Sequence, residues 1–279
     1  MDVNTAFPNS VIKEEVYLEQ LDGVVVHKKD SHVCKLKKDL YRLKQAPCAW
    51  YGRIDGFLVS LGFTKSDANP NLYYKIVNDE PLILVLYVDD LFLTGNEKLI
   101  VWCKKKLASE FEMKDLGLMH YFLGLEVWQR QKDIFLGQGK YTIDILKRFG
   151  MLDCKSIATL MDANLKKSRD SASDSNLIDP TMYRRLIGSL MYLTNTRPNI
   201  CFVVNALSQF MCEPRKIHWI ATKHVLRYLR GTMGDGLRYD LECDLKLQGF
   251  TDSDWVRCST NSNNTSGCCF SLGFAVISW

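Results

Sequence analysis

Long hydrophobic runs are missing from this 279-residue sequence. No apolar stretch reaches the roughly 18 to 20 residues that a membrane-spanning helix needs, so we expect no membrane association. The first ten residues, MDVNTAFPNS, also lack the basic segment followed by an apolar segment that marks a secretory signal. No internal repeat is visible. These absences favour an ordinary globular protein, with one large domain or two smaller ones.

Metal-ligand spacings built on cysteine and histidine are missing too. The ten cysteines are scattered, and no CxxC pair is followed by a second pair or by a histidine pair at zinc spacing. Cys268 and Cys269 are adjacent, but adjacency alone gives them little weight as ligands. We expect free, mostly buried thiols in a reducing compartment.

Charge is modest in total but uneven along the chain. The formal net charge is +4, whereas residues 27–53 contain eight Lys and Arg against two Asp, with Tyr41, Trp50 and Tyr51 interleaved. Such a segment can bind a phosphate backbone while its aromatic rings meet sugars or bases. A solvated basic face has the same composition, and charge alone leaves both interpretations open.

Hydrophobic periodicity predicts a mixed α+β fold. We expect strands within 14–20, 33–41, 72–77, 82–88 and 91–95, a hairpin within 119–138, and three short strands within 246–279. Helical spacing predicts helices within 46–63, 97–111, 140–151, 179–196 and 215–231. The last helix is expected to place Ile217, Ile220, His224, Tyr228 and Leu229 on one face. A Ser-, Asp- and Lys-rich stretch near 165–180 predicts a mobile linker.

Two carboxylates interrupt the most hydrophobic segment, LILVLYVDDLFLTG at residues 82–95. Asp89 and Asp90 form a two-residue break between strand-like runs, which is the commonest length of a hairpin loop. Neighbouring carboxylates beside apolar surface repel each other and lose hydration, which raises the pKa of at least one of them. A Mg²⁺ or Mn²⁺ ion would neutralise them. A solvent-exposed acidic turn without a ligand is equally compatible with this segment.

A third carboxylate, Asp2, opens the strand-like segment MDVNTAF. One carboxylate facing two on a hairpin tip can bind two divalent ions about 3.5–4 Å apart, an arrangement that serves phosphoryl transfer. In the sequence alone, Asp2 is equally a cap or a surface residue. An unrelated metal-dependent phosphotransferase would use the same hairpin, but the GxxxxGK[ST] phosphate loop is absent, so we rank that hypothesis last.

Six segments occur in order and at fitting intervals along the chain. They are MDVNTAF, LYRLKQAPCAWY, LILVLYVDDLFLTG, MKDLGLMHYFLGLEV, RRLIGSLMYLTNTRPNI and TDSDW…TSGCCFSLG…ISW. Together they resemble the reverse transcriptase region, with the start of the ribonuclease H domain, of a copia-type LTR-retrotransposon Pol polyprotein, most similar to plant elements. The resemblance covers essentially the whole chain, and the ordered series is far more specific than its Tyr-Val-Asp-Asp box.

The resemblance implies a right-hand polymerase fold. Residues 1–135 would form the fingers and palm, truncated at the N-terminus, 136–240 the thumb and a helical connection, and 241–279 a partial ribonuclease H-like sheet. The implied activity is RNA-directed DNA polymerisation on a primed RNA or DNA template, with a dNTP as substrate and two Mg²⁺ or Mn²⁺ ions as cofactors. Intact elements also encode capsid, protease and integrase segments for DNA integration. For a protein of such an element, the expected location is a cytoplasmic virus-like particle or the nucleus. A homodimer is one possible oligomeric state.

The resemblance also assigns roles around the carboxylates. Asp2 and Asp89 would be the main metal ligands, Asp90 would support them, and the backbone carbonyl of Val3 would also touch metal. Phe7 would lie under the sugar of the incoming nucleotide and disfavour a 2′-hydroxyl. Plain core packing is an equal alternative for Phe7.

Further residues would contact the nucleic acid. Gln45 would touch the incoming nucleotide or the template base, although the sequence alone favours a polar residue at a helix start. Lys44, Leu123 and Gly124 would contact primer or template, although Gly124 could equally mark a bulge. The basic stretch 28–53 and Lys104–Lys106 would lie along template or primer phosphates.

Several departures from the family pattern weaken the expected activity. Asp252 matches the first catalytic aspartate of the ribonuclease H domain, but the later acidic residues would follow Trp279, so we expect no ribonuclease activity. Arg42 stands where the family has Gly, and Cys48 where it has Arg. With no fingers strands before Asp2, these changes predict a truncated or decayed copy. The two leading hypotheses are therefore an RNA-directed DNA polymerase and a catalytically inactive nucleic-acid-binding remnant.

Overall fold

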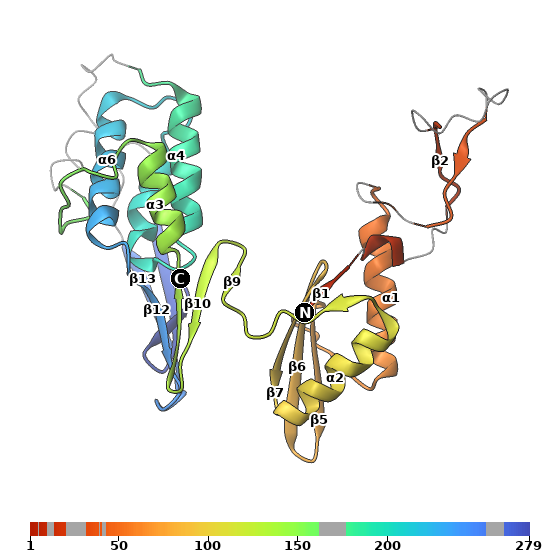
Figure 1. Ribbon diagram of the computed structural model, residues 1–279. Coiled ribbons are helices and arrows are strands. Elements are labelled where there is room, and N and C mark those ends of the chain that lie inside the picture. Colours follow the sequence, from red (N-terminus) through yellow and green to blue (C-terminus); the bar gives the residue numbers. More distant parts are fainter. Residues whose placement is uncertain are drawn as a thin grey trace. The chain divides into compact units, whose positions relative to one another are not determined.

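The computed structural model describes residues 1–4, 6–9, 14–20, 32–38, 40, 43–161, 177–254 and 265–279. The chain forms two compact units, Met1–Leu118 and Met119–Trp279. Each unit combines helices with antiparallel strands, in agreement with the predicted mixed α+β class (Figure 1).

The first unit is built around a six-stranded sheet with the strand order β4-β5-β6-β7-β1-β8. Its strands are β1 (Asp2–Val3), β4 (Thr64–Lys65), β5 (Leu72–Val77), β6 (Glu80–Tyr87), β7 (Asp90–Gly95) and β8 (Met113–Lys114). The other elements are the 3-10 helix η1 (Phe7–Asn9), the paired strands β2 (Tyr17–Leu18) and β3 (Cys34–Lys35), and the helices α1 (Ala46–Ser60) and α2 (Glu97–Glu110). The long strands and both α-helices lie where the periodicity predicted them.

Alternation along β6 gives this sheet two different faces. Leu82, Leu84 and Leu86 are buried in one core cluster with side chains of both helices, among them Trp50 of α1 and Leu107 of α2. The intervening β6 side chains point to the opposite face. We call the side packed against α1 and α2 the helix face, and the other side the open face.

The second unit contains two sheets and a group of packed helices. One sheet has the order β12-β11-β10-β9 and the other β13-β14-β15. The strands are β9 (Tyr121–Phe122), β10 (Leu125–Gln129), β11 (Asp133–Gly137), β12 (Gly236–Asp240), β13 (Leu247–Asp254), β14 (Thr265–Leu272) and β15 (Ala275–Ser278). The helices are α3 (Gly139–Arg148), α4 (Pro180–Leu193), η3 (Pro198–Ile200), α5 (Cys201–Ser208) and α6 (Lys216–Gly231). The Tyr239 hydroxyl joins the sheets by donating a 3.1 Å hydrogen bond to the Val276 carbonyl.

One sequence prediction about the helices was wrong, and one helix was not predicted. Helix α6 buries Ala221, Thr222, Val225, Leu226 and Leu229, whereas Ile220, predicted on the core face, is 56% exposed. The helix is rotated because the stripe around Val225 offers a more continuous apolar surface than the stripe around Ile220. Helix α5 was not predicted, since CFVVNALS is apolar at most positions and shows little periodicity.

Other predictions concern cysteines, the linker and membranes. Among the described cysteines all are free, but Cys103 alone is buried, so the expectation of mostly buried thiols was wrong. Burial raises the pKa of the Cys103 thiol to about 11. The part of the predicted linker before position 177 lies outside the described residues. Its last position, Pro180, is the first residue of α4. Within the described ranges, no helix has both the length and the apolar character needed to cross a membrane.

Candidate functional site

The acidic hairpin lies between β6 and β7, and its turn is one residue earlier than predicted. Tyr87 pairs with Asp90, so Val88 and Asp89 form the two-residue turn and Asp90 is the first residue of β7. The burial of alternate leucines on β6 fixes this register, because a shift by one residue would turn them toward solvent. Asp89 is therefore at the tip, and Asp90 is within the sheet.

Strand β1 brings Asp2 directly opposite Asp90. Two backbone hydrogen bonds flank this pair: from the Val3 N–H to the Asp89 carbonyl (2.9 Å) and from the Leu91 N–H to the Met1 carbonyl (2.8 Å). Because the bonds flank the pair and do not join it, Asp2 and Asp90 are a non-hydrogen-bonded pair. In such pairs the opposite side chains come closest together.

Both carboxylates point to the open face. Their neighbours Val3 and Leu91 are 2% and 1% exposed and belong to the core cluster on the helix face. Successive side chains of a strand alternate between the two faces, so Asp2 and Asp90 point away from that core. The first unit thus presents a pair of half-buried carboxylates on a surface that its own helices leave accessible.

Lys114 extends this pair on the other side of β1. It lies directly opposite Asp2 on β8, so its exposed side chain shares the open face. The row across three neighbouring strands is therefore Asp90, Asp2 and Lys114. Sequence reasoning missed Lys114, although it belongs to the recognised segment MKDLG, because only the strand pairing places it beside the carboxylates.

The electrostatics of the row favour a bound cation. Burial raises the pKa of Asp90, and the negative charges of Asp89 and Asp2 raise it further, while the Met1 ammonium group opposes this shift. Like charges directly opposite one another in a sheet are destabilising. A cation between the carboxylates would remove this repulsion and stabilise the local fold.

The residues present fit a metal that shares its coordination with a substrate. Within the described ranges, no group of three or more His, Cys, Asp or Glu side chains is arranged to hold a metal ion. Asp2 and Asp90 form a two-carboxylate set, and Asp89 lies beside it in the turn. This fits Mg²⁺, which is usually bound by one or two carboxylates, several waters and substrate phosphates. The carbonyl of Val3 was predicted to contact the metal. The N–H of Val3 donates a hydrogen bond to the Asp89 carbonyl.

The predicted nucleotide-binding residues lie in the same unit. Phe7 is in η1, half-buried against the core cluster of the helix face. Gln45 immediately precedes α1, and its side chain makes no capping hydrogen bond. Lys44 is exposed next to it. Lys44 and Gln45 therefore stand together at one helix N-terminus.

Leu123 and Gly124 form the turn between β9 and β10 in the second unit. Their φ angles are +46° and +80°, the combination that a type I′ turn requires. Leu123 is 52% exposed at the tip. A Cβ atom on Gly124 would lie 2.7 Å from the Tyr192 hydroxyl oxygen, so glycine here permits a close approach of α4.

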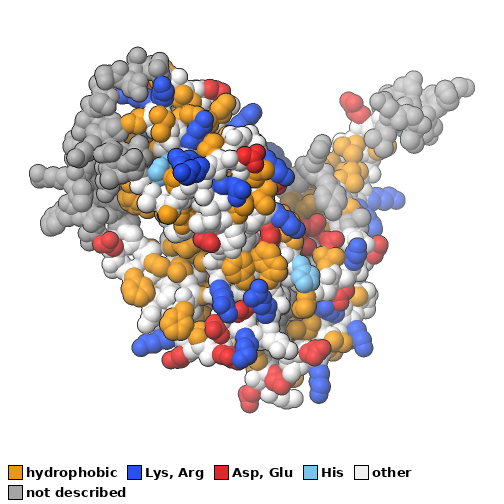
Figure 2. All heavy atoms as spheres, turned by 60° about the vertical axis from the view of Figure 1, so that its left-hand side comes forward, with side chains coloured by type: hydrophobic (Ala, Val, Ile, Leu, Met, Phe, Trp, Pro, Cys, Tyr) orange, Lys and Arg blue, Asp and Glu red, His pale blue; other side chains and the backbone are white. Residues whose placement is uncertain are grey.

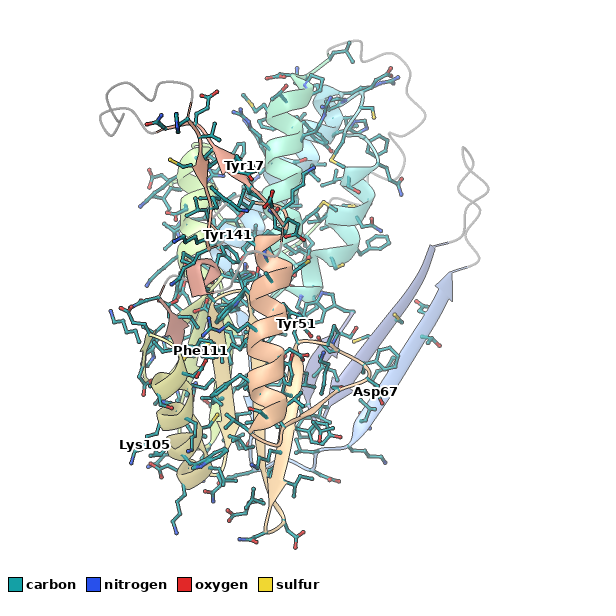
Figure 3. The ribbon with its side chains drawn as sticks, turned by 90° about the vertical axis from the view of Figure 1, so that its right-hand side faces the viewer. Tyr17, Tyr51, Asp67, Lys105, Phe111 and Tyr141 are labelled. Carbon is teal, nitrogen blue, oxygen red and sulfur yellow. The ribbon has the colours of Figure 1, made fainter. Side chains whose placement is uncertain are left out.

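The remaining predicted contacts are scattered. Lys104 pairs with Asp115 at 2.8 Å, and Lys105 projects from the outer side of α2 (Figure 3). Helix α2 packs on the helix face, opposite the face to which Asp2 and Asp90 point. Arg42 and part of the basic stretch lie outside the described residues. Asp252 is exposed on β13 of the second unit.

A line of positive charge runs along α6. Lys216 is exposed, whereas Lys223 and Arg227 are half-buried, and the Arg227 Nε–H donates a 2.8 Å hydrogen bond to the Lys155 carbonyl. Lys216, Lys223 and Arg227 lie on the side opposite the buried stripe, and α6 contains no Asp or Glu. None of the ion pairs among the described residues involves these three side chains. Figure 2 shows Lys and Arg side chains interspersed with acidic and hydrophobic side chains over the face that is turned forward. We call these three residues the α6 basic stripe.

Comparison with known proteins gives a consistent result. Residues 1–163 match the family described as "Reverse transcriptase (RNA-dependent DNA polymerase)". The chain is 38% identical over its whole length to the retrovirus-related Pol polyprotein from transposon RE2 of Arabidopsis thaliana, and 38% to that from transposon TNT 1-94 of Nicotiana tabacum. It spans only 19% and 22% of those polyproteins. The putative transposon Ty5-1 protein YCL074W of Saccharomyces cerevisiae is 33% identical over the whole chain, which covers 91% of it. None of the solved structures matches the chain.

Proposed function

This chain belongs to the reverse transcriptase (RNA-dependent DNA polymerase) family, and from that premise we propose that it transfers a deoxynucleotide from a dNTP to a primer 3′-hydroxyl. The observation that carries the proposal is the close pair of carboxylates, Asp2 and Asp90, on the open face of the first unit. A pair of this kind next to an exposed lysine suits a triphosphate with its divalent cations.

We assign the finer organisation by the same reasoning. Residues 1–135 would be the fingers and palm, residues 136–240 the thumb and connection, and residues 241–279 a ribonuclease H-like sheet of a copia-type element. Asp252 would be the carboxylate that remains from the ribonuclease H site.

The chain's own residues would act as follows. Asp2 and Asp89 would be the main ligands of the cations, as the resemblance implies, and Asp90, directly opposite Asp2, would support them. When bound, divalent ions supply activation of the attacking hydroxyl and charge neutralisation at the leaving pyrophosphate. Lys114 provides a fixed positive charge beside the carboxylates for the phosphates of the nucleotide. A cation bound here would relieve the repulsion between Asp2 and Asp90, which offsets part of the cost of bringing metal and phosphates together on this face.

Contacts with the remaining substrate parts are assigned to residues near helix and strand turns. Phe7 and Gln45 would contact the incoming nucleotide, and Lys44, Leu123 and Gly124 the primer and template. The α6 basic stripe would add phosphate contacts, because a helix face with lysine and arginine and no acid attracts a nucleic-acid backbone.

Primer extension on an RNA template tests this function. Purified protein with Mg²⁺ or Mn²⁺ should extend the primer, and Asp89→Ala should reduce extension to background. Asp67→Ala is the matched control, since Asp67 is an exposed aspartate of the same unit in the loop between β4 and β5 (Figure 3). Equal background from wild type and Asp89→Ala would show that this chain is not a polymerase.

A second candidate function is nucleic-acid binding without catalysis. The α6 basic stripe favours it, because the stripe does not depend on the carboxylates. It predicts salt-sensitive binding to primer–template without extension. An absence of binding at low salt would exclude this candidate.

A further inference from the structure

The turn that carries Asp89 has an unfavourable backbone conformation at Val88. The φ angle of Val88 is +53°, and a β-branched residue at positive φ is a genuine conformational outlier. Val88 is the first residue of a two-residue turn in which Asp89 keeps an ordinary φ. This is the pattern of a type II′ turn, where glycine usually occupies the first position. A conformation of this kind persists only where the surrounding structure holds it.

Packing of the Val88 side chain does not explain why the conformation persists. That side chain is 49% exposed, so its burial contributes little. The backbone of the turn is held by hydrogen bonds instead. The indole N–H of Trp50 donates a 2.7 Å hydrogen bond to the Val88 carbonyl. The adjacent Asp89 carbonyl accepts the N–H of Val3. Both carbonyls of the turn are therefore held, one by α1 and the other by β1.

Trp50 is well suited to hold a backbone group. It is 2% exposed, and its ring meets that of Phe111 edge-on at 5.3 Å between centroids. Phe111, labelled in Figure 3, is itself buried in the same core cluster. A buried ring packed edge-on against Phe111 has little freedom to turn its single N–H, and a buried indole N–H needs an acceptor.

We propose that Trp50 is a positioning residue that holds the Val88–Asp89 turn in the conformation that presents the aspartates to the metal and nucleotide. The inference rests on the proposed function and deepens it. Trp50 donates its indole hydrogen bond to the Val88 carbonyl and not to a carboxylate, so it acts through the backbone of the turn. The alternative is that the hydrogen bond only satisfies a buried donor and has no effect on the turn.

A double-mutant cycle separates the two possibilities. Trp50→Phe keeps a ring but removes the donor, and Val88→Gly removes the conformational penalty, because glycine adopts positive φ readily. If Trp50 holds the turn, Trp50→Phe should lower stability and reduce kcat for primer extension at least tenfold, with little change in the KM for the dNTP. In the Val88→Gly background both losses should be several times smaller. A tryptophan that only fills the core would not be rescued by glycine on another element.

The unfolding midpoint and primer extension are both measured for the wild type, each single variant and the double variant. Equal losses from Trp50→Phe in the valine and glycine backgrounds would overturn the inference, whether or not the wild type extends primers. If no variant extends a primer, the proposed function fails, and the stability cycle still decides the role of Trp50 in the turn. If Trp50→Phe does not fold, folding of Trp50→Phe/Val88→Gly supports the inference and failure of both overturns it.

Discussion

Replacing Asp90 by asparagine should make the metal-free protein more stable and less active. Opposite residues in a sheet have Cβ atoms about 5 Å apart, where two like charges repel by roughly 0.8 kcal/mol in water and about 3 kcal/mol near a protein surface. Asp2 and Asp90 are both half-buried, so solvent screening favours the lower part of this range. We expect Asp90→Asn to raise the free energy of local unfolding by about 1 kcal/mol at pH 7 without metal.

The pH dependence has a definite sign. The pKa of Asp90 is raised in the folded state, so above its ordinary value of 3.8 the folded protein retains a proton that the unfolded chain loses. Stability contributed by this group therefore falls as the pH rises through the interval between 3.8 and the raised pKa. The advantage of Asp90→Asn should disappear below pH 3.8, where Asp90 is neutral in both states.

Hydrogen exchange of the β6 and β7 amides measures this local stability directly. Saturating Mg²⁺ should make the wild type more stable than Asp90→Asn. At a concentration of 100 times its Kd, the ion stabilises the wild type by about 2.7 kcal/mol and the variant much less. Asp67→Asn should leave exchange in these strands unchanged. If the Asp90→Asn variant is less stable than the wild type at pH 7 without metal, the inferred repulsion between Asp2 and Asp90 is refuted.

Three further predictions follow from other contacts. Lys114→Ala should raise the KM for the dNTP at least tenfold in steady-state primer extension, whereas Lys105→Ala, on the outer side of α2, should not; equal effects would contradict the role of Lys114. Gly124→Ala should destabilise the protein by about 1–3 kcal/mol in urea unfolding, because the φ of residue 124 is +80° and the added Cβ would meet the Tyr192 hydroxyl. A second substitution, Tyr192→Phe, should recover only part of this loss, since it removes the clash but not the unfavourable φ. Lys223→Glu should weaken primer–template binding and reduce the slope of log K against log salt by at least about one unit, measured by fluorescence anisotropy; an unchanged slope would remove the α6 basic stripe from the interface.

Local patterns in the sequence were sufficient for much of the fold. The long strands of the first unit and most helices follow from periodicity, because the pattern that packs one element against a core is written within that element. The family was also recognisable from the order of six segments, and the match over residues 1–163 confirms it. The failures were also local in origin: α5 has little periodicity, and the face of α6 around Ile220 was chosen over the more continuous apolar stripe around Val225.

The site depended on information that no single segment contains. Asp89 and Asp90 were visible as an acidic break, but which of them stands in the turn follows from the pairing of Tyr87 with Asp90. That Asp2 faces Asp90 depends on the register between β1 and β7. Register is set by non-local pairing and by burial of the opposite face, so it cannot be read from either strand separately.

The sequence by itself therefore determined the family, the main elements and the identity of the acidic residues. Tertiary structure alone decided that Asp2, Asp90 and Lys114 form one row on the open face and that the indole of Trp50 holds the carbonyl of Val88. The physical reason is that periodicity records how each element meets solvent and core. Contacts between residues far apart in the chain arise only when the packed elements fix one another's position.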